Sequence, residues 1–335
     1  MESSAKNLNF ATWLRAFSML LILACHYCAA CSIPAVSMLG QVFNIGVQLF
    51  FILSGFLTGY KGIQRPYAAW YRKRARRIYI PYWLFLISLA GIHLVRGMNI
   101  CNTDWLLLWI GAQGSNVGVW GAGQTWFISA LLLCYLTSPA ILFVNQWLIK
   151  RDNKKVNISL GALVCALPLI YASAEAEWVY TLLNPISLYS LACVYGANYQ
   201  KNSGYPRTNK QLIVCCAMIA VAFGARFVAR GTIDGTIWYD RIVVPYTHMI
   251  AASAIWVIFE ILFAERNIPK PVQLISDISF EIYLWHYMFV VGPISVFALL
   301  GNWGVACIVV TMIVFMLSLV SSKISTYLSK ISLKK

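Results

Sequence analysis

Long apolar segments alternate with short polar segments along the whole chain. A helix needs about 20 apolar residues to cross a bilayer, and runs of about that length recur at about ten places. We assign the predicted spans to residues 11–30, 37–60, 78–96, 124–148, 157–173, 180–198, 211–229, 242–264, 278–298 and 304–322. The pattern predicts an all-α, polytopic membrane helix bundle of about ten transmembrane helices. We expect residues 1–335 to form a single membrane domain with no appended soluble domain.

The segment between the third and fourth predicted spans is rich in Gly and Trp. Within it, Trp105–Ile110 is apolar but too short to cross a bilayer. We predict a re-entrant or interfacial helix there.

Composition and charge support the membrane assignment. Hydrophobic residues make up 60% of the chain and charged residues only 11%, whereas soluble domains are typically about 25% charged. The formal net charge is +15, and most Lys and Arg residues fall on one predicted side. This asymmetry follows the positive-inside rule and predicts cytoplasmic termini. Because the charge is explained as an orientation signal, we expect no nucleic-acid partner.

Two ionisable side chains, Arg15 and His26, interrupt the first predicted span. They are eleven residues apart, which on a helix is about 20° beyond three full turns and about 16 Å along the axis. They therefore share one helix face at different depths. Ionisable groups inside a span are costly and usually face a cavity or a partner, so we predict a functional role for both.

A dense basic run follows the second predicted span. It contains five cations within six positions: Arg72, Lys73, Arg74, Arg76 and Arg77. One interpretation is a positive-inside anchor with an aromatic belt. The other is a phosphate site, because Arg74 and Arg77 fall at i and i+3 on one helix face, where two guanidiniums can clamp a phosphate.

The ninth predicted span opens with Ile278–His286. His286 would lie about 12 Å into the membrane, near the depth that His26 reaches from the other direction. Glu281 and Glu260 are the carboxylates that could partner these histidines. A structural histidine with satisfied hydrogen bonds is the alternative interpretation of His286.

Several residues predicted at the outer side carry a second interpretation. Trp126 could stack on a sugar ring or anchor the chain at the interface. Arg226 and Arg230, one turn apart, could line an outer cavity or extend to the headgroups.

Cys25, Cys28 and Cys31 flank His26, but we interpret them as packing residues and expect no metal. A disulfide between Cys31 and Cys101 is the remaining alternative for two of the ten cysteines.

Five motifs in order resemble the acyltransferase-3 family of bacterial integral membrane acyltransferases. They are Arg15 with His26 in the first span, residues 46–56 (GVQLFFILSGF), Arg74 with Arg77 before residues 78–83 (IYIPYW), residues 125–128 (TWFI), and residues 278–286 (ISFEIYLWH). Together they cover nearly the whole chain.

The resemblance implies a multi-pass protein of the bacterial cytoplasmic (inner) membrane. It implies transfer of an acyl group, commonly acetyl, from cytoplasmic acyl-CoA to a hydroxyl of a cell-surface or lipid-linked saccharide. His26 would be the catalytic base, with Arg15 a partner in the same pore. Arg74 and Arg77 would bind the CoA phosphates, and the adjacent Arg72 and Lys73 would extend that basic site. His286 and Tyr283 belong to the last motif, with a substrate or pore role.

The chain departs from the family pattern at one position. Many members carry a Glu shortly after the Trp of the fourth-span motif, whereas residues 129–133 read SALLL here. If that carboxylate orients a base elsewhere in the family, another group must do so in this chain. Direct transfer in a ternary complex and a covalent acyl-enzyme on His26 both stay open.

A transporter or flippase is the alternative function, because intramembrane Arg and His residues also mark transport pathways. The sequence shows no paired halves with interrupted helices, the usual signature of transporters. The basic cytoplasmic run also favours an anionic cofactor.

Overall fold

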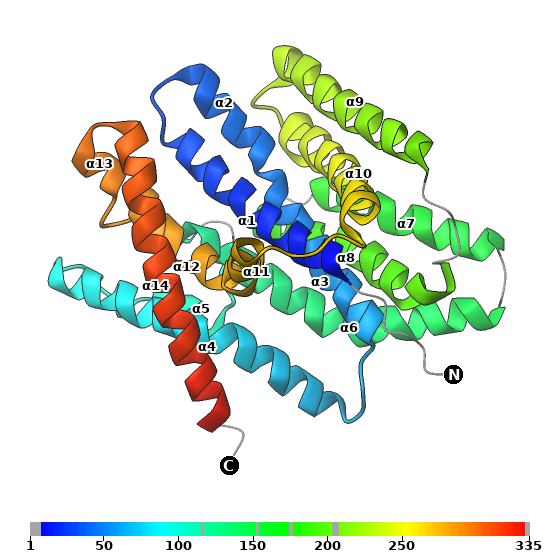
Figure 1. Cartoon of the computed structure of the whole chain (residues 1–335), viewed down its shortest axis with the longest axis horizontal. Coiled ribbons are helices and arrows are strands. Elements are labelled where there is room, and N and C mark those ends of the chain that lie inside the picture. Colours follow the sequence, from blue (N-terminus) through cyan, green and yellow to red (C-terminus); the bar gives the residue numbers. More distant parts are fainter. Residues whose placement is uncertain (1–7, 115–116, 152–153, 174–176, 203–207, 332–335) are drawn as a thin grey trace.

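The computed structural model describes residues 8–114, 117–151, 154–173, 177–202 and 208–331. Within these residues every regular element is a helix, and the helices form one bundle (Figure 1). Among the described residues, seven candidate membrane spans are long and apolar enough to cross a bilayer. The prediction of an all-α polytopic bundle is confirmed. The predicted spans at 157–173, 180–198 and 278–298 are not among these seven candidates.

The first half of the chain forms α1 (Asn9–Ala29), α2 (Pro34–Phe43), α3 (Ile45–Lys61), α4 (Tyr67–Val95), α5 (Thr103–Ile110), η1 (Gly123–Thr125) and α6 (Trp126–Arg151). The short helix α5 confirms that Trp105–Ile110 is helical. Asn102 caps its first turn, and Gly111 ends it in the left-handed conformation. Helix α4 begins well before the predicted start at residue 78, so the basic run is helical.

The second half forms α7 (Lys154–Ala172), α8 (Glu177–Asn202), α9 (Asn209–Ile233), η2 (Tyr239–Val243), α10 (Val244–Phe263), α11 (Lys270–Asp277), α12 (Ser279–Val290), α13 (Val296–Leu300) and α14 (Trp303–Ile331). The prediction of one continuous helix over 278–298 is wrong. Helix α12 ends at Val290, shortly before Gly292 and Pro293. Proline lacks an amide donor and disfavours helical geometry in the preceding residue, which here is a glycine, so the pair favours the end of the helix.

Helix α3 packs closely on α8 through small residues. A Cβ added at Gly55 or Gly59 would overlap the carbonyl oxygens of Tyr189 and Cys193 of α8. Because glycine leaves this space free, the two backbones approach directly, as the small residues of this segment predict.

Helix α1 lies between two buried clusters and contributes to both. Phe10 and Leu14 pack in a cluster with residues of α3, α8 and α10. Met19 and Ile22 pack in a second cluster with residues of α4, α6, α12 and α14. Successive turns of α1 therefore meet different helices. The central position of α1 is visible in Figure 1, and Arg15 and His26 on this helix are both partly buried.

Candidate functional site

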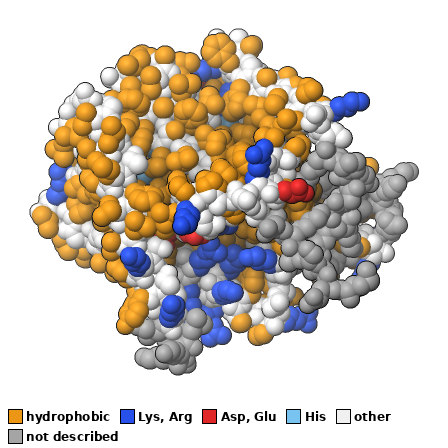
Figure 2. Space-filling view, viewed as in Figure 1, with side chains coloured by type: hydrophobic (Ala, Val, Ile, Leu, Met, Phe, Trp, Pro, Cys, Tyr) orange, Lys and Arg blue, Asp and Glu red, His pale blue; other side chains and the backbone are white. Residues whose placement is uncertain are grey.

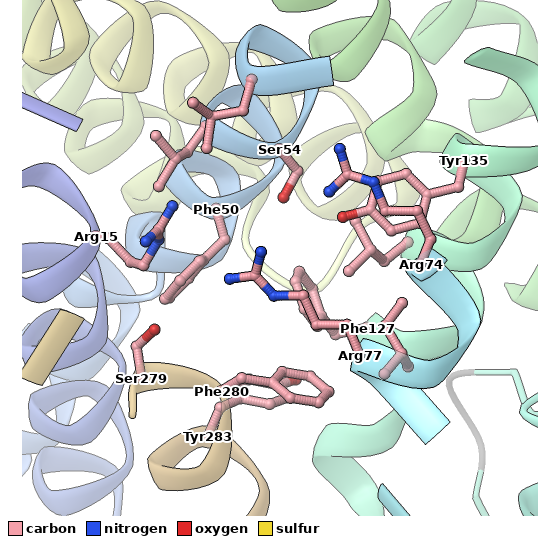
Figure 3. Close-up of a pocket in the computed structure, with 14 residues that line it drawn as sticks. Arg15, Phe50, Ser54, Arg74, Arg77, Phe127, Tyr135, Ser279, Phe280 and Tyr283 are labelled. Carbon is pink, nitrogen blue, oxygen red and sulfur yellow. The ribbon is translucent and has the colours of Figure 1, made fainter. Parts of the chain in front are cut away.

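Three arginines converge on one cavity between α1, α3, α4, α6 and α12. Arg15, Arg74 and Arg77 line it, and the lining includes no carboxylate. In Figure 3, Arg15 and Arg77 extend toward each other from α1 and α4. This arginine cavity contains about 770 Å³ of unfilled space, including its open mouth. Three unneutralised guanidiniums in a partly apolar cavity form a site for an anion.

Neighbouring side chains hold these guanidiniums in place. The Arg15 guanidinium donates a hydrogen bond of 3.4 Å to the Ser276 hydroxyl. The guanidinium carbon of Arg74 lies 5.3 Å from the ring centre of Trp70 and 5.0 Å from that of Tyr135. These cation–π contacts fix the arginine without neutralising its charge. Across the part of the chain that the structure describes, none of the three arginines forms an ion pair.

The basic run of α4 divides between two cavities. Arg72 and Lys73 do not line the arginine cavity with Arg74; they line a separate space between α4 and α14 that we call the α4–α14 cleft. Helical rotation is the reason, because Arg72 lies about 160° around the axis from Arg74. Arg77 lies between these directions and lines both cavities. The structure therefore does not bring the four predicted phosphate ligands together.

His26 and His286 form a pair deeper in the bundle. Their ring centres are 4.9 Å apart, and the ring of Tyr287 lies 5.2 Å from that of His26. His286 is fully buried, whereas His26 is only partly buried. His26 is therefore the more exposed of the two histidines.

One hydrogen bond fixes the tautomer of His286. Its Nδ1 lies 2.7 Å from the carbonyl oxygen of Tyr283. A carbonyl only accepts, so Nδ1 carries the hydrogen and Nε2 of the neutral ring is a bare acceptor. Among the described residues this buried Nε2 has no hydrogen-bond partner. An unsatisfied buried acceptor beside His26 is costly in a purely structural role.

Aromatic side chains separate the arginine cavity from the histidine pair. Tyr283 lines the cavity, and its ring centre lies 5.7 Å from that of His286. Phe127 packs against Tyr283 at 5.0 Å and against Phe51 at 4.9 Å. Arg15 faces the cavity, but His26 is not in its lining. The predicted shared pore is therefore closed by one aromatic layer in this structure.

The predicted carboxylate partners lie elsewhere. Glu281 lines the α4–α14 cleft, because five residues along a helix place it about 140° around the axis from His286. Glu260 accepts hydrogen bonds from the Tyr195 hydroxyl at 3.1 and 3.3 Å. Tyr283, at i−3, is the member of α12 that contacts His286 instead.

A second cavity lies on the other side of the aromatic layer. It contains about 770 Å³ of unfilled space, and its lining combines polar side chains with Trp126 and other apolar side chains. We call it the amide cavity after Asn44, Gln48 and Asn184; Asp240 and His248 also line it. The Oε1 atom of Gln48 is buried and has no partner among the described residues. This lining offers neutral donors and acceptors rather than positive charge.

Residues that are neighbours in sequence line different cavities. On α3, Phe50 lines the arginine cavity and Phe51 lines the amide cavity. At the start of α6, Phe127 lines the arginine cavity and Trp126 lines the amide cavity. The wall is thus built from two pairs of consecutive aromatic residues. Trp126, for which sugar stacking and interfacial anchoring were the two predicted roles, lines the amide cavity.

Arg226 and Arg230 tie α9 to α2. Arg226 donates one hydrogen bond to the backbone oxygen of Gln41 at 3.1 Å and another to Nε2 of His248. Arg230 donates to Gln41 Oε1 at 2.9 Å and pairs with Asp234 at 3.3 Å. Neither arginine lines the arginine cavity or the amide cavity. Arg226 reaches the amide cavity only through His248.

Sequence reasoning missed Gln48, Asn184 and Tyr287. Gln48 carried a signal, because it is the one polar residue in the run GVQLFF. The cysteines around His26 are unpaired thiols, as is Cys101. Within the described ranges no group of three or more His, Cys, Asp or Glu side chains could hold a metal.

Residues 8–324 match the family model described as an acyltransferase domain. The match covers most of the chain, and all five motifs lie within the matched residues. The chain therefore belongs to the acyltransferase-3 family. No curated protein and no solved structure gave a significant match.

Proposed function

We propose that this member of the acyltransferase-3 family moves an acyl group, with acetyl as our first choice, from acyl-CoA to a hydroxyl of a saccharide. The observation that carries the proposal is the arginine cavity, where three guanidiniums and no carboxylate lie beside a buried histidine pair. Family membership supports acyl transfer in general. The donor and the acceptor are our proposals.

The arginine cavity suits the two chemical parts of CoA. Its phosphates are anionic, and Arg74 and Arg77 offer planar donor groups to them. The pantetheine arm is narrower and less polar, and it would lie against Phe50 and Leu53. The basic run near this cavity would face the cytoplasm by the positive-inside rule, where acyl-CoA is made. The bacterial inner membrane is our proposed location, as the resemblance to the family implies.

Saccharide hydroxyls would occupy the amide cavity. Side-chain amides both donate and accept, which matches a hydroxyl group. Trp126 offers an apolar face for a sugar ring beside Asn184 and Asp240. Glycolipid or surface-glycan acceptors would reach this cavity from the end opposite the basic run.

His26 would act as the general base. Its imidazole removes the proton of the acceptor hydroxyl while the hydroxyl oxygen attacks the thioester carbonyl carbon. The new ester C–O bond forms, the C–S bond breaks, and the sulfur leaves as a thiolate. The protonated His26 then returns the proton to that sulfur, which gives free CoA. For this step the aromatic layer at Phe127 and Tyr283 must open, since it separates the cavities.

His286 would take the place of the carboxylate that many family members carry. Residues 129–133 supply no acidic group, whereas the ring of His286 lies beside His26. Its bare Nε2 can accept a hydrogen bond from an N–H of His26 and so orient that ring. We therefore propose a positioning role for His286.

Equilibrium binding of acetyl-CoA to the purified full chain tests the donor site directly. The Arg74→Ala/Arg77→Ala variant is compared with wild type, and Arg151→Ala is the control, since Arg151 is an exposed cation that stacks on Trp147 at the end of α6. We expect saturable binding that weakens at least about tenfold in the double variant only. Absence of binding by folded wild-type protein would refute an acetyl-CoA donor. Release of CoA thiol that depends on an added glycan then tests the transfer.

A further inference from the structure

The α4–α14 cleft is larger than either cavity used above. It contains about 1730 Å³ of unfilled space, including its opening, between the first turns of α4 and the last turns of α14. Figure 2 shows Lys and Arg side chains gathered below the hydrophobic part of this face, in the region that α4 crosses in Figure 1. The proposed reaction uses the space on the other side of α4, so the cleft has no assigned role there.

Five cations line the cleft against two carboxylates. The cations are Arg72, Lys73, Arg76, Arg77 and Lys330, and the carboxylates are Asp277 and Glu281. The lining therefore carries a formal charge of +3. Across the residues that the structure describes, none of these cations is ion-paired. Asp277 accepts a hydrogen bond of 2.8 Å from Gln273 of its own helix. The cleft thus keeps an uncompensated positive charge.

The facing wall on α14 is made of hydroxyl groups. Ser322, Ser325 and Ser329 recur at helical spacing and line the cleft on one face. Ser325 is 8% exposed, and its Oγ atom has no hydrogen-bond partner among the described residues. A buried hydroxyl without a partner costs free energy unless a ligand satisfies it. Guanidinium, ammonium and hydroxyl donors together match a phosphate, whose oxygens only accept.

The position of the cleft indicates where that phosphate comes from. Helices α4 and α14 are both candidate membrane spans, and the cleft lies at one end of each. The outer face of α14 exposes large apolar side chains, including Met312, Met316 and Val320. A lipid alongside α14 would bring its headgroup to the level of the cleft. Basic pockets between spanning helices at this level recognise anionic lipid headgroups.

We propose that the α4–α14 cleft binds the phosphate of an anionic phospholipid headgroup. The cations of α4 hold the phosphate from one side, and the Ser325 hydroxyl donates to it from α14. A soluble phosphate ester offers the same chemistry, and the test below separates the two sources. The proposal does not rest on the proposed acyl transfer, because it is tested by lipid binding.

The experiment titrates fluorescent phosphatidylglycerol into the full chain in a neutral detergent. Arg72→Gln/Arg76→Gln removes two cations of the cleft, and Lys150→Gln/Arg151→Gln removes two exposed cations at the end of α6. We expect the dissociation constant to rise about tenfold or more in the first variant and by less than about twofold in the control. An equal loss of lipid affinity in both variants would show general electrostatic attraction and would refute a specific lipid site in the cleft.

Ser325→Ala supplies a second measurement that keeps every charge. We expect about a threefold rise in the dissociation constant with a thermal unfolding midpoint no lower than that of wild type. An unchanged dissociation constant in Ser325→Ala would remove α14 from the site. Competition settles the source: unlabelled phosphatidylglycerol should displace the probe, whereas phosphatidylcholine and inorganic phosphate should not at the same concentration. Equal displacement by inorganic phosphate would overturn the lipid assignment.

Discussion

The arginine cavity and the amide cavity lie on either side of one aromatic layer, yet they offer opposite chemistry. The first presents three guanidiniums and apolar side chains. The second presents amides, a carboxylate and Trp126. A phosphate would be held in the first and repelled by Asp240 in the second, whereas the second offers an uncharged sugar amides that both donate and accept. The contrast teaches that charge, rather than size, would distinguish the two substrates under the proposed function.

The largest loss of activity is expected from a change at His26, the proposed base that acts on both substrates. Replacing His26 with Ala removes the base that joins donor to acceptor, so transfer should fall by about 10²- to 10⁴-fold. Acetyl-CoA binding should remain, because His26 does not line the arginine cavity. The measurement is acceptor-dependent thiol release beside equilibrium binding on the same preparation. Full activity in this variant would remove His26 as the base.

Replacing Arg15 with Gln should act on the donor side alone. One charge-assisted contact is lost, so the KM for acetyl-CoA should rise about tenfold or more. The KM for the saccharide should stay within about twofold, because Arg15 is absent from the amide cavity. Initial rates with each substrate varied in turn measure both constants. A change confined to the saccharide KM would reverse our assignment of the two cavities.

Replacing His286 with Gln should lower kcat about tenfold while both KM values stay near wild type. The side chain is fully buried and reaches neither cavity directly, so it acts through His26. Steady-state kinetics and a thermal unfolding curve of the same variant provide the measurement. A role in stability alone would lower the unfolding midpoint and leave kcat per folded molecule unchanged.

The smallest expected effect concerns Gln48 and tests whether the amide cavity binds the saccharide. Gln48→Leu removes the unpartnered Oε1 atom from the amide cavity, and we expect the saccharide KM to rise about fivefold with acetyl-CoA binding unchanged. The unfolding midpoint is measured in parallel. If Gln48 contacts no ligand, the variant should instead be more stable than wild type and unchanged in KM, because an unsatisfied buried group has been removed.

The separation of Arg15 and His26 along α1 followed from their spacing alone. Helical rise places them about 16 Å apart, and the structure puts one at the arginine cavity and the other beside His286. The sequence also placed Arg74 and Arg77 on one helix face. It could not show which cations of the basic run line the arginine cavity and which line the α4–α14 cleft. Which face of α4 meets α14 is decided by residues some 250 positions later, so Arg72 and Lys73 could not be told from Arg74.

The residues near His286 in the sequence could not predict its partner either. Glu281 was the nearest acidic side chain in sequence, but helical rotation turns it into the cleft. The His26–His286 contact depends on how α1 packs against α12, and that contact joins residues from opposite ends of the chain. The amide cavity collects single polar residues from several helices, so no continuous motif could predict it.

Arg77 contributes to the walls of both the arginine cavity and the α4–α14 cleft. One guanidinium has a fixed number of N–H donors, and those turned toward one compartment are withdrawn from the other. Under the two assignments proposed above, the occupancies of these compartments are antagonistic. Such coupling is reciprocal: the factor by which bound lipid weakens the donor equals the factor by which bound donor weakens the lipid. The composition of the surrounding bilayer would then set the effective affinity for the donor, without any separate regulatory domain.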